Sequence, residues 1–171
     1  AGLGKSLALK ADSTVVGWGD SASSVPIGLS NVIAIAAGSG SMALRADGSI
    51  VIWGPWWAGS GKVPADMTNV IAIAGGYFGW LALKADGTVV DSFGEGMPAG
   101  GLSNVVAISG SSGTDGHVNL GLKSDGTVVG WGFDHCTGCT GPVPSDLSNV
   151  VAIAAGGYHN LALLGYGAPF V

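Results

Sequence analysis

The chain has 171 residues, a formal net charge of −5 and a charged fraction of only 10%. Six Lys and Arg residues are too few to follow a nucleic-acid backbone, and 32 glycines disfavour a helix-rich fold. The apolar fraction of 47% is too high for a disordered tail, so we expect a folded domain without nucleic-acid partners. Asn, Gly and Pro interrupt the uncharged stretches, so we expect no membrane span.

Two short sequence units alternate along the chain and return about every 39 residues. An apolar unit that begins with asparagine occupies residues 31–38, 69–76, 104–110 and 149–156. A second unit, with an aspartate between two apolar runs, occupies 7–19, 42–54, 81–94 and 120–132, with a partial copy at 161–164. Repetition at this period is typical of solenoids and propellers.

Each repeat is predicted to form three short strands. In the first complete repeat these are 32–37, 42–45 and 49–53, and the first of them is too short for a stable helix. Asp47-Gly48 predicts a two-residue hairpin turn between the last two strands, because both residue types tolerate a positive φ. The turn returns at Asp86-Gly87 and Asp125-Gly126, and it is weakened at Asp12-Ser13.

A three-stranded sheet of this size cannot bury both of its faces alone. Its alternating small and branched side chains suit stacking against sheets of the same kind. We therefore predict an all-β fold of β-propeller-type repeats with three-stranded antiparallel blades, in a partial or four-to-five-blade array, with a linear β-solenoid as the alternative. The predicted units of this single repeat domain are a partial blade at 1–27, blades at 28–65, 66–100 and 101–146, and a partial blade at 147–171.

The repeats resemble a known family. Residues 122–132 (Leu-Lys-Ser-Asp-Gly-Thr-Val-Val-Gly-Trp-Gly) and 152–163 (Ala-Ile-Ala-Ala-Gly-Gly-Tyr-His-Asn-Leu-Ala-Leu) are similar to the regulator of chromosome condensation repeat. The short period looks most like the bacterial version of this repeat, which includes the propeller-type β-lactamase inhibitory protein. The resemblance covers nearly the whole chain and implies the propeller fold. Members of the family serve as nucleotide-exchange factors, enzyme inhibitors and binding scaffolds, and the repeat alone does not transfer the exchange activity.

The chain departs from the family's pattern in length and at two sites. The family's propellers usually have seven blades, which at this period would need roughly 270 residues. The third repeat replaces Gly-Trp-Gly by Asp-Ser-Phe-Gly at 91–94, and the linker 109–118 is longer than its counterparts. We expect both sites to form special surfaces.

Both ends of the chain bring the second strand of a repeat, which predicts unpaired sheet edges and uncovered faces. We expect the chain either to be a piece of a longer protein or to assemble with copies of itself. A head-to-tail contact between copies would build a ring or a filament.

Cys136 and Cys139 are separated by two residues. A zinc site needs four ligands, and the sequence has no second cysteine pair. We interpret the pair as a disulfide that staples a Gly-rich loop of a secreted or extracellular bacterial protein. Free thiols and metal or redox chemistry are the alternatives, and no cofactor or metal is predicted.

The sequence contains no nucleophile elbow, P-loop or dinucleotide-binding motif, and turns account for its repeated aspartates. We therefore predict a protein that is not an enzyme. The candidate partner-binding residues lie in predicted loops and are Trp56, Trp57, Phe133 and His117. Paired loop tryptophans anchor protein interfaces or stack on sugar rings, and they can also cover a sheet edge locally. For His117 a solvated loop position is the simplest interpretation.

The predicted function is a scaffold for protein–protein interaction that includes self-association into a homo-oligomer or polymer. One alternative is a structural subunit of an extracellular filament or ring. Another is a lectin-like carbohydrate binder that uses its aromatic loops.

Overall fold

The computed structural model describes residues 2, 4–19, 24–54, 63–64, 67–93, 97–113, 116–134 and 143–165. Within these ranges the chain forms thirteen β-strands, and none of the described residues lies in a helix. The described part accordingly contains no helix that could cross a membrane. The predicted all-β fold is confirmed.

The strands form five antiparallel sheets, each made of consecutive strands. The first sheet holds β1 (Lys5–Leu9) and β2 (Val15–Gly19), and the second holds β3 (Val32–Ala37), β4 (Ser41–Arg45) and β5 (Ile50–Trp53). The third sheet holds β6 (Val70–Gly75), β7 (Trp80–Lys84) and β8 (Val89–Asp91). The fourth holds β9 (Val105–Ser109), β10 (Gly116–Lys123) and β11 (Val128–Asp134), and the fifth holds β12 (Val150–Ala155) and β13 (Asn160–Leu164). The three complete sheets are the predicted three-stranded blades.

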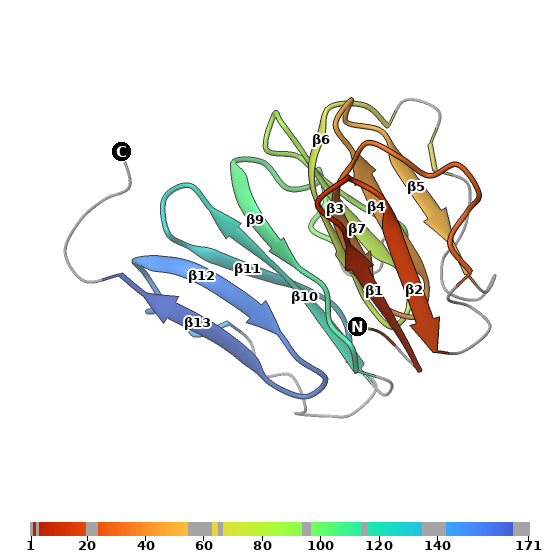
Figure 1. The fold of residues 1–171 in the computed structure, drawn as a ribbon. Coiled ribbons are helices and arrows are strands. Elements are labelled where there is room, and N and C mark those ends of the chain that lie inside the picture. Colours follow the sequence, from red (N-terminus) through yellow and green to blue (C-terminus); the bar gives the residue numbers. More distant parts are fainter. Residues whose placement is uncertain are drawn as a thin grey trace.

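The five sheets pack one behind another in chain order, from the first (red) to the fifth (blue) in Figure 1. The first strand of a sheet packs against the first and middle strands of the sheet before it, since β6 contacts both β3 and β4, and β12 contacts both β9 and β10. Antiparallel sheets stacked in this way are the blades of a propeller and not the coils of a β-solenoid.

Three buried clusters hold successive sheets together. Each cluster joins aliphatic residues of one sheet to a tryptophan of the next sheet. The groups are Leu7 with Trp53, Met42 and Leu44 with Trp80, and Leu81 and Leu83 with Trp131. We call the aliphatic side of a sheet its leucine face and the opposite side its tryptophan face. Full burial of one leucine contributes about 1.5–3 kcal/mol, so these faces supply much of the stability of the stack.

In the third sheet the tryptophan comes from a different strand. In the second sheet Trp53 of the last strand stands opposite Ser41 of the middle strand. In the third sheet Trp80 lies in the middle strand, its backbone N–H donates to Ser92 Oγ (2.8 Å), and Ser92 N–H donates to its carbonyl (3.0 Å). The two residue types have therefore exchanged places across one strand pair. Trp80 still lies in the buried cluster with Met42, so the tryptophan face is preserved.

The hairpin turns differ from the prediction. Gly48 N–H donates to the Arg45 carbonyl (3.0 Å) and Arg45 N–H donates to the Ser49 carbonyl (2.9 Å), so the loop has three residues and not two. Gly48 has a φ of +78°, whereas the Asp47 carboxylate accepts the backbone N–H of Ser49 (2.9 Å). The two-residue prediction is wrong because the aspartate stabilises the turn through its side chain and only the glycine takes the left-handed conformation.

The repeated asparagines also have a structural reason. Asn69 and its three equivalents have φ values from +56° to +59°, a conformation that asparagine tolerates better than most residues. The carbonyl of Asn69, just before β6, accepts the N–H of Ala85 (2.9 Å), just after β7 of the same sheet. The turn of one sheet also bonds to the next sheet, because Val105 N–H donates to the Gly87 carbonyl (3.1 Å). The asparagine carbonyl thus joins two strands within a blade, and the glycine carbonyl joins one blade to the next.

Candidate functional site

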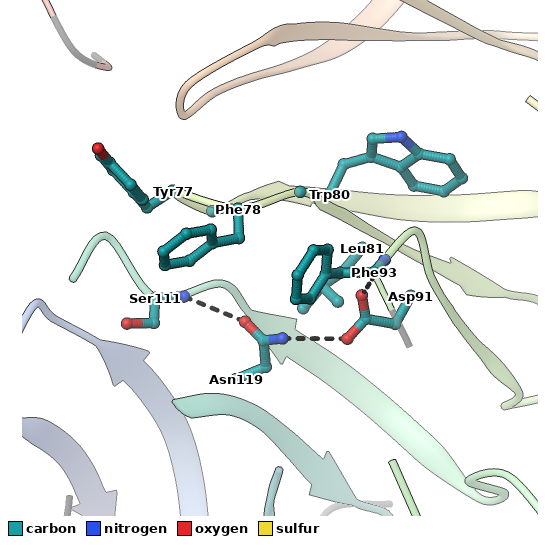
Figure 2. A pocket seen from close by; sticks show the side chains of 10 residues that line it. Tyr77, Phe78, Trp80, Leu81, Asp91, Phe93, Ser111 and Asn119 are labelled. Atoms are coloured by element: carbon teal, nitrogen blue, oxygen red, sulfur yellow. Dashed lines mark hydrogen bonds between the residues drawn. The ribbon is translucent and has the colours of Figure 1, made fainter. Parts of the chain in front are cut away.

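The two sites that break the repeat lie next to each other, between the third and fourth sheets. The Asp91 carboxylate accepts hydrogen bonds from Trp131 Nε1 (2.8 Å), from Asn119 Nδ2 (3.1 Å) and from the backbone N–H of Phe93 (2.9 Å). Asn119 Oδ1 in turn accepts the backbone N–H of Ser111 (3.3 Å), which lies in the long linker. Figure 2 shows this chain of polar contacts from Ser111 to Asp91.

Three aromatic rings lie beside these polar groups. Tyr77 and Phe78 meet edge to face at 4.8 Å between ring centroids, and Phe78 and Phe93 lie 5.8 Å apart. The cavity that they share with Asp91 and Asn119 has a volume of about 10 Å³. That is room for about one water molecule, whereas pockets for small molecules measure about 300–1,000 Å³. The two departures from the repeat therefore link two blades by hydrogen bonds and do not form a substrate pocket. We call the hydrogen bonds to Asp91 from Asn119 and Trp131 the tie.

Two of the predicted site residues lie in strands and not in loops. His117 belongs to β10 and Phe133 to β11, and the two residues are directly paired across the hairpin. The loop prediction is wrong because part of the long linker extends β10 by Gly116–Val118, which pair with the end of β11. Trp56, Trp57, Cys136 and Cys139 lie outside the described residues.

The fifth sheet leaves its leucine face uncovered. Leu161 and Leu163 are each 63% exposed, whereas their equivalents in the third sheet, Leu81 and Leu83, are 2% and 0% exposed. The residues beside them on β12 are exposed as well. We call this surface the C-terminal face, and it consists of Ala152, Ala154, Leu161 and Leu163. The repeat pattern does not reveal it, because every position keeps the residue type of a buried interface.

The first sheet leaves its tryptophan face uncovered. Trp18 is 56% exposed and Val16 is 47% exposed, whereas the equivalent Trp53 and Trp131 are 9% and 3% exposed. Ala8 is partly buried and lies on the same side of the first sheet as Trp18. Its equivalent Ala43 lies on the tryptophan face of the second sheet. We call Ala8, Val16 and Trp18 the N-terminal face. The two uncovered faces thus stand at opposite ends of the row of sheets (Figure 1).

The turn aspartates are held as structural anions. The Thr14 hydroxyl donates to Asp12 (2.6 Å) and, with Lys10, lowers the pKa of Asp12 to about 2. The equivalent hydrogen bonds from Ser49, Thr88 and Thr127 lower the pKa values of Asp47, Asp86 and Asp125. Each of these carboxylates is engaged with its own turn. Paired acid–base chemistry would need one carboxyl group with a raised pKa, and none of these four provides it.

The stacked three-stranded sheets, their inter-blade clusters and their repeated turns define a β-propeller repeat protein. No protein-family model and no curated protein sequence matches the chain. Solved structures do match it. The ectodomain of the Physcomitrella patens receptor kinase CR4 has a TM-score of 0.71 at 23% identity, covering 95% of this chain and 48% of that one. Human WBSCR16 has a TM-score of 0.66 at 18% identity, covering 96% of this chain and 56% of that one.

The particular type of propeller follows from a third match. Prp20p from Saccharomyces cerevisiae, the yeast RCC1, has a TM-score of 0.63 at 18% identity, covering 92% of this chain and 53% of that one. The fold is therefore that of the regulator of chromosome condensation type of β-propeller, as the sequence resemblance predicted. The chain spans about half the length of the solved structures that it matches.

Proposed function

We propose that the chain is a non-catalytic β-propeller scaffold that binds proteins, copies of itself included, through its uncovered end faces. The observation that carries this proposal is the 63% exposure of Leu161 and Leu163, whose equivalents Leu81 and Leu83 are buried. A contiguous exposed apolar surface on a folded domain is typical of an interaction site.

The composition of the two faces supports the same function. None of the seven residues of the N-terminal and C-terminal faces carries a charge. Burial of such surfaces is driven by the hydrophobic effect and is insensitive to salt. Trp18 adds a large aromatic group, the residue type that contributes most to the energy of protein interfaces.

Two of the structural neighbours support a protein partner. Prp20p has binding properties toward Gsp1p and histones, and the yeast RCC1 structure contains bound Kap60. The same fold thus serves protein binding elsewhere. In this chain the turn aspartates are engaged within their own hairpins, and the cavity beside Asp91, with about 10 Å³, is too small to hold a substrate.

A structural subunit of a filament or ring is the second candidate function. The two uncovered faces differ from each other and stand at opposite ends of the row. Contacts between unlike surfaces of identical chains are head-to-tail, and they build closed rings or open filaments.

Light scattering over a concentration series tests the proposal. We expect a mass above the monomer's 16.7 kDa that rises with protein concentration and changes little with added salt. The double variant Leu161→Glu/Leu163→Glu is expected to lower the mass toward that of the monomer. A wild-type chain that stays at 16.7 kDa up to its solubility limit would contradict the proposal.

A further inference from the structure

Three of the four interfaces between successive sheets join the same two kinds of surface. In each of these three the leucine face of one sheet meets the tryptophan face of the next, as with Leu81 and Leu83 against Trp131. Across the described residues this pairing occurs three times in chain order. Each of the first four sheets therefore presents one surface of each kind, and the two kinds are complementary.

The two uncovered ends repeat the sequences of one of these buried interfaces. Residues 161–163 of the fifth sheet read Leu-Ala-Leu, as do residues 81–83 on the buried leucine face of the third sheet. Residues 15–19 of the first sheet read Val-Val-Gly-Trp-Gly, as do residues 128–132 of the strand that covers that face. Both halves of the interface between the third and fourth sheets thus occur a second time, and in the described part of the chain neither copy is covered by another sheet.

The first strands of the third and fifth sheets, β6 and β12, also match in sequence. Ala72 and Ala74 of β6 pack against the buried cluster between the third and fourth sheets. Their equivalents on β12, Ala152 and Ala154, are exposed beside Leu161. Small residues at these positions let the next sheet approach closely, which is the geometry that the propeller uses at each internal interface.

We infer that the C-terminal face of one copy binds the N-terminal face of a second copy, with Trp18 packed on Leu161 and Leu163. This inference rests on the proposed function and names the partner of its uncovered face. Trp18 needs no polar partner in that position. Trp53 is buried at the equivalent internal site although, among the described residues, its Nε1 has no hydrogen-bond acceptor.

The contact leaves one face of each copy free. The second copy still presents its own C-terminal face, so further copies add in the same direction. Two variants, each with one blocked face, are therefore expected to combine into a pair that cannot grow.

Mixing two single-face variants tests this inference. The C-face variant is Leu161→Glu/Leu163→Glu and the N-face variant is Trp18→Glu. Each alone is expected to weaken self-association by at least about 30-fold in dissociation constant, the effect of losing an interface hot spot. An equimolar mixture is expected to form a 1:1 complex, because the intact C-terminal face of one variant meets the intact N-terminal face of the other. Analytical ultracentrifugation measures the masses.

Ile71→Glu is the matched control. Ile71 is 56% exposed, as Trp18 is, but it lies on β6 of the third sheet, which is covered on both faces. This variant is expected to associate like the wild-type chain. Circular dichroism and urea unfolding establish that every variant is folded, and Leu163→Lys and Trp18→Ser replace any variant that is not.

The outcomes separate the inference from the proposed function. If the C-face variant is monomeric but the N-face variant associates like the wild type, the C-terminal face binds something other than the N-terminal face. The inference is then wrong and the proposed function stands. The inference is also wrong if the two variants remain monomers when mixed. A wild-type chain that is monomeric throughout overturns both.

Discussion

The third and fifth sheets carry the same Leu-Ala-Leu strand in opposite surroundings. Leu83 is completely buried under the fourth sheet, whereas Leu163 is 63% exposed at the end of the row. The two strands have the same length and pair with the first strand of their sheet in the same register, although β7 also pairs with β8 on its other side. The comparison teaches that a strand of this type folds with or without its cover. Burial is a property of the neighbouring blade and not of the strand.

The largest expected effect is the difference between these two leucines. Leu83→Ala is expected to lower the free energy of unfolding by about 3 kcal/mol, because it removes buried methyl groups and leaves a cavity. Leu163→Ala is expected to change it by less than about 0.5 kcal/mol, as for an ordinary surface substitution. Urea unfolding at a concentration where the chain is monomeric measures both values. Equal losses would show that the fifth sheet is covered in solution even in the monomer.

The second largest effect concerns the hydrogen bonds that form the tie at Asp91 of the third sheet. Trp131→Phe removes a hydrogen bond to a carboxylate, whereas Trp53→Phe removes an Nε1 that has no acceptor among the described residues. Since hydrogen bonds to charged groups contribute about 1.5–3 kcal/mol, we expect Trp131→Phe to cost about 2 kcal/mol more than Trp53→Phe. Both variants lose similar ring area, so thermal or urea unfolding of the pair isolates the hydrogen bond. A smaller loss for Trp131→Phe would refute the stabilising role of the tie.

The hairpin turns of the first and third sheets give a smaller effect of opposite sign. Ser13 has a φ of +62° at the position where Gly87 has +79°. Ser13→Gly is expected to raise the free energy of unfolding by about 1 kcal/mol, because it removes the strain of a left-handed serine. Gly87→Ser is expected to lower it by at least about 1 kcal/mol, since its Cβ would also lie 3.0 Å from the backbone nitrogen of Asn104. Differential scanning calorimetry measures the two shifts, and shifts of the same sign would contradict this account.

The smallest effect is the response of the turns to acid. Hydroxyl groups in the turns lower the pKa values of the four aspartates in the folded chain, that of Asp12 to about 2. A pKa that is lower in the folded than in the unfolded chain stabilises the fold above pH about 3.9, the ordinary value for aspartate. This stability is expected to be lost as the pH falls from about 4 toward 2. The triple variant Asp47→Asn/Asp86→Asn/Asp125→Asn should show a flatter decline in urea titrations, and an unchanged slope would exclude the turns as its cause.

Much of the fold could be predicted from the repeat. The predicted strand 32–37 is β3 as observed, and 42–45 and 49–53 each differ from β4 and β5 by one residue. Local periodicity and turn residues set these boundaries, so a single sequence was enough. The turn type was wrong because it depends on the hydrogen-bond register between two strands, which the dipeptide Asp-Gly does not fix.

The candidate site was less predictable. The sequence singled out 91–94 and 109–118 as departures from the repeat, but it did not reveal that Asp91 and Asn119 are hydrogen-bonded across two blades. His117 was assigned to a loop because an insertion in a repeat does not say whether it extends a hairpin. Such contacts between distant segments follow from how the blades stack.

By itself the sequence determined the repeating unit, its strands, and the asparagine and glycine residues that its left-handed positions need, because these depend on neighbours along the chain. It also set the two kinds of face, since residues alternate sides along a strand. Only the tertiary structure decided which copies of these faces are covered. A face is buried only where a neighbouring sheet covers it, and in the described part of the chain no sheet covers the faces of Trp18 and Leu163.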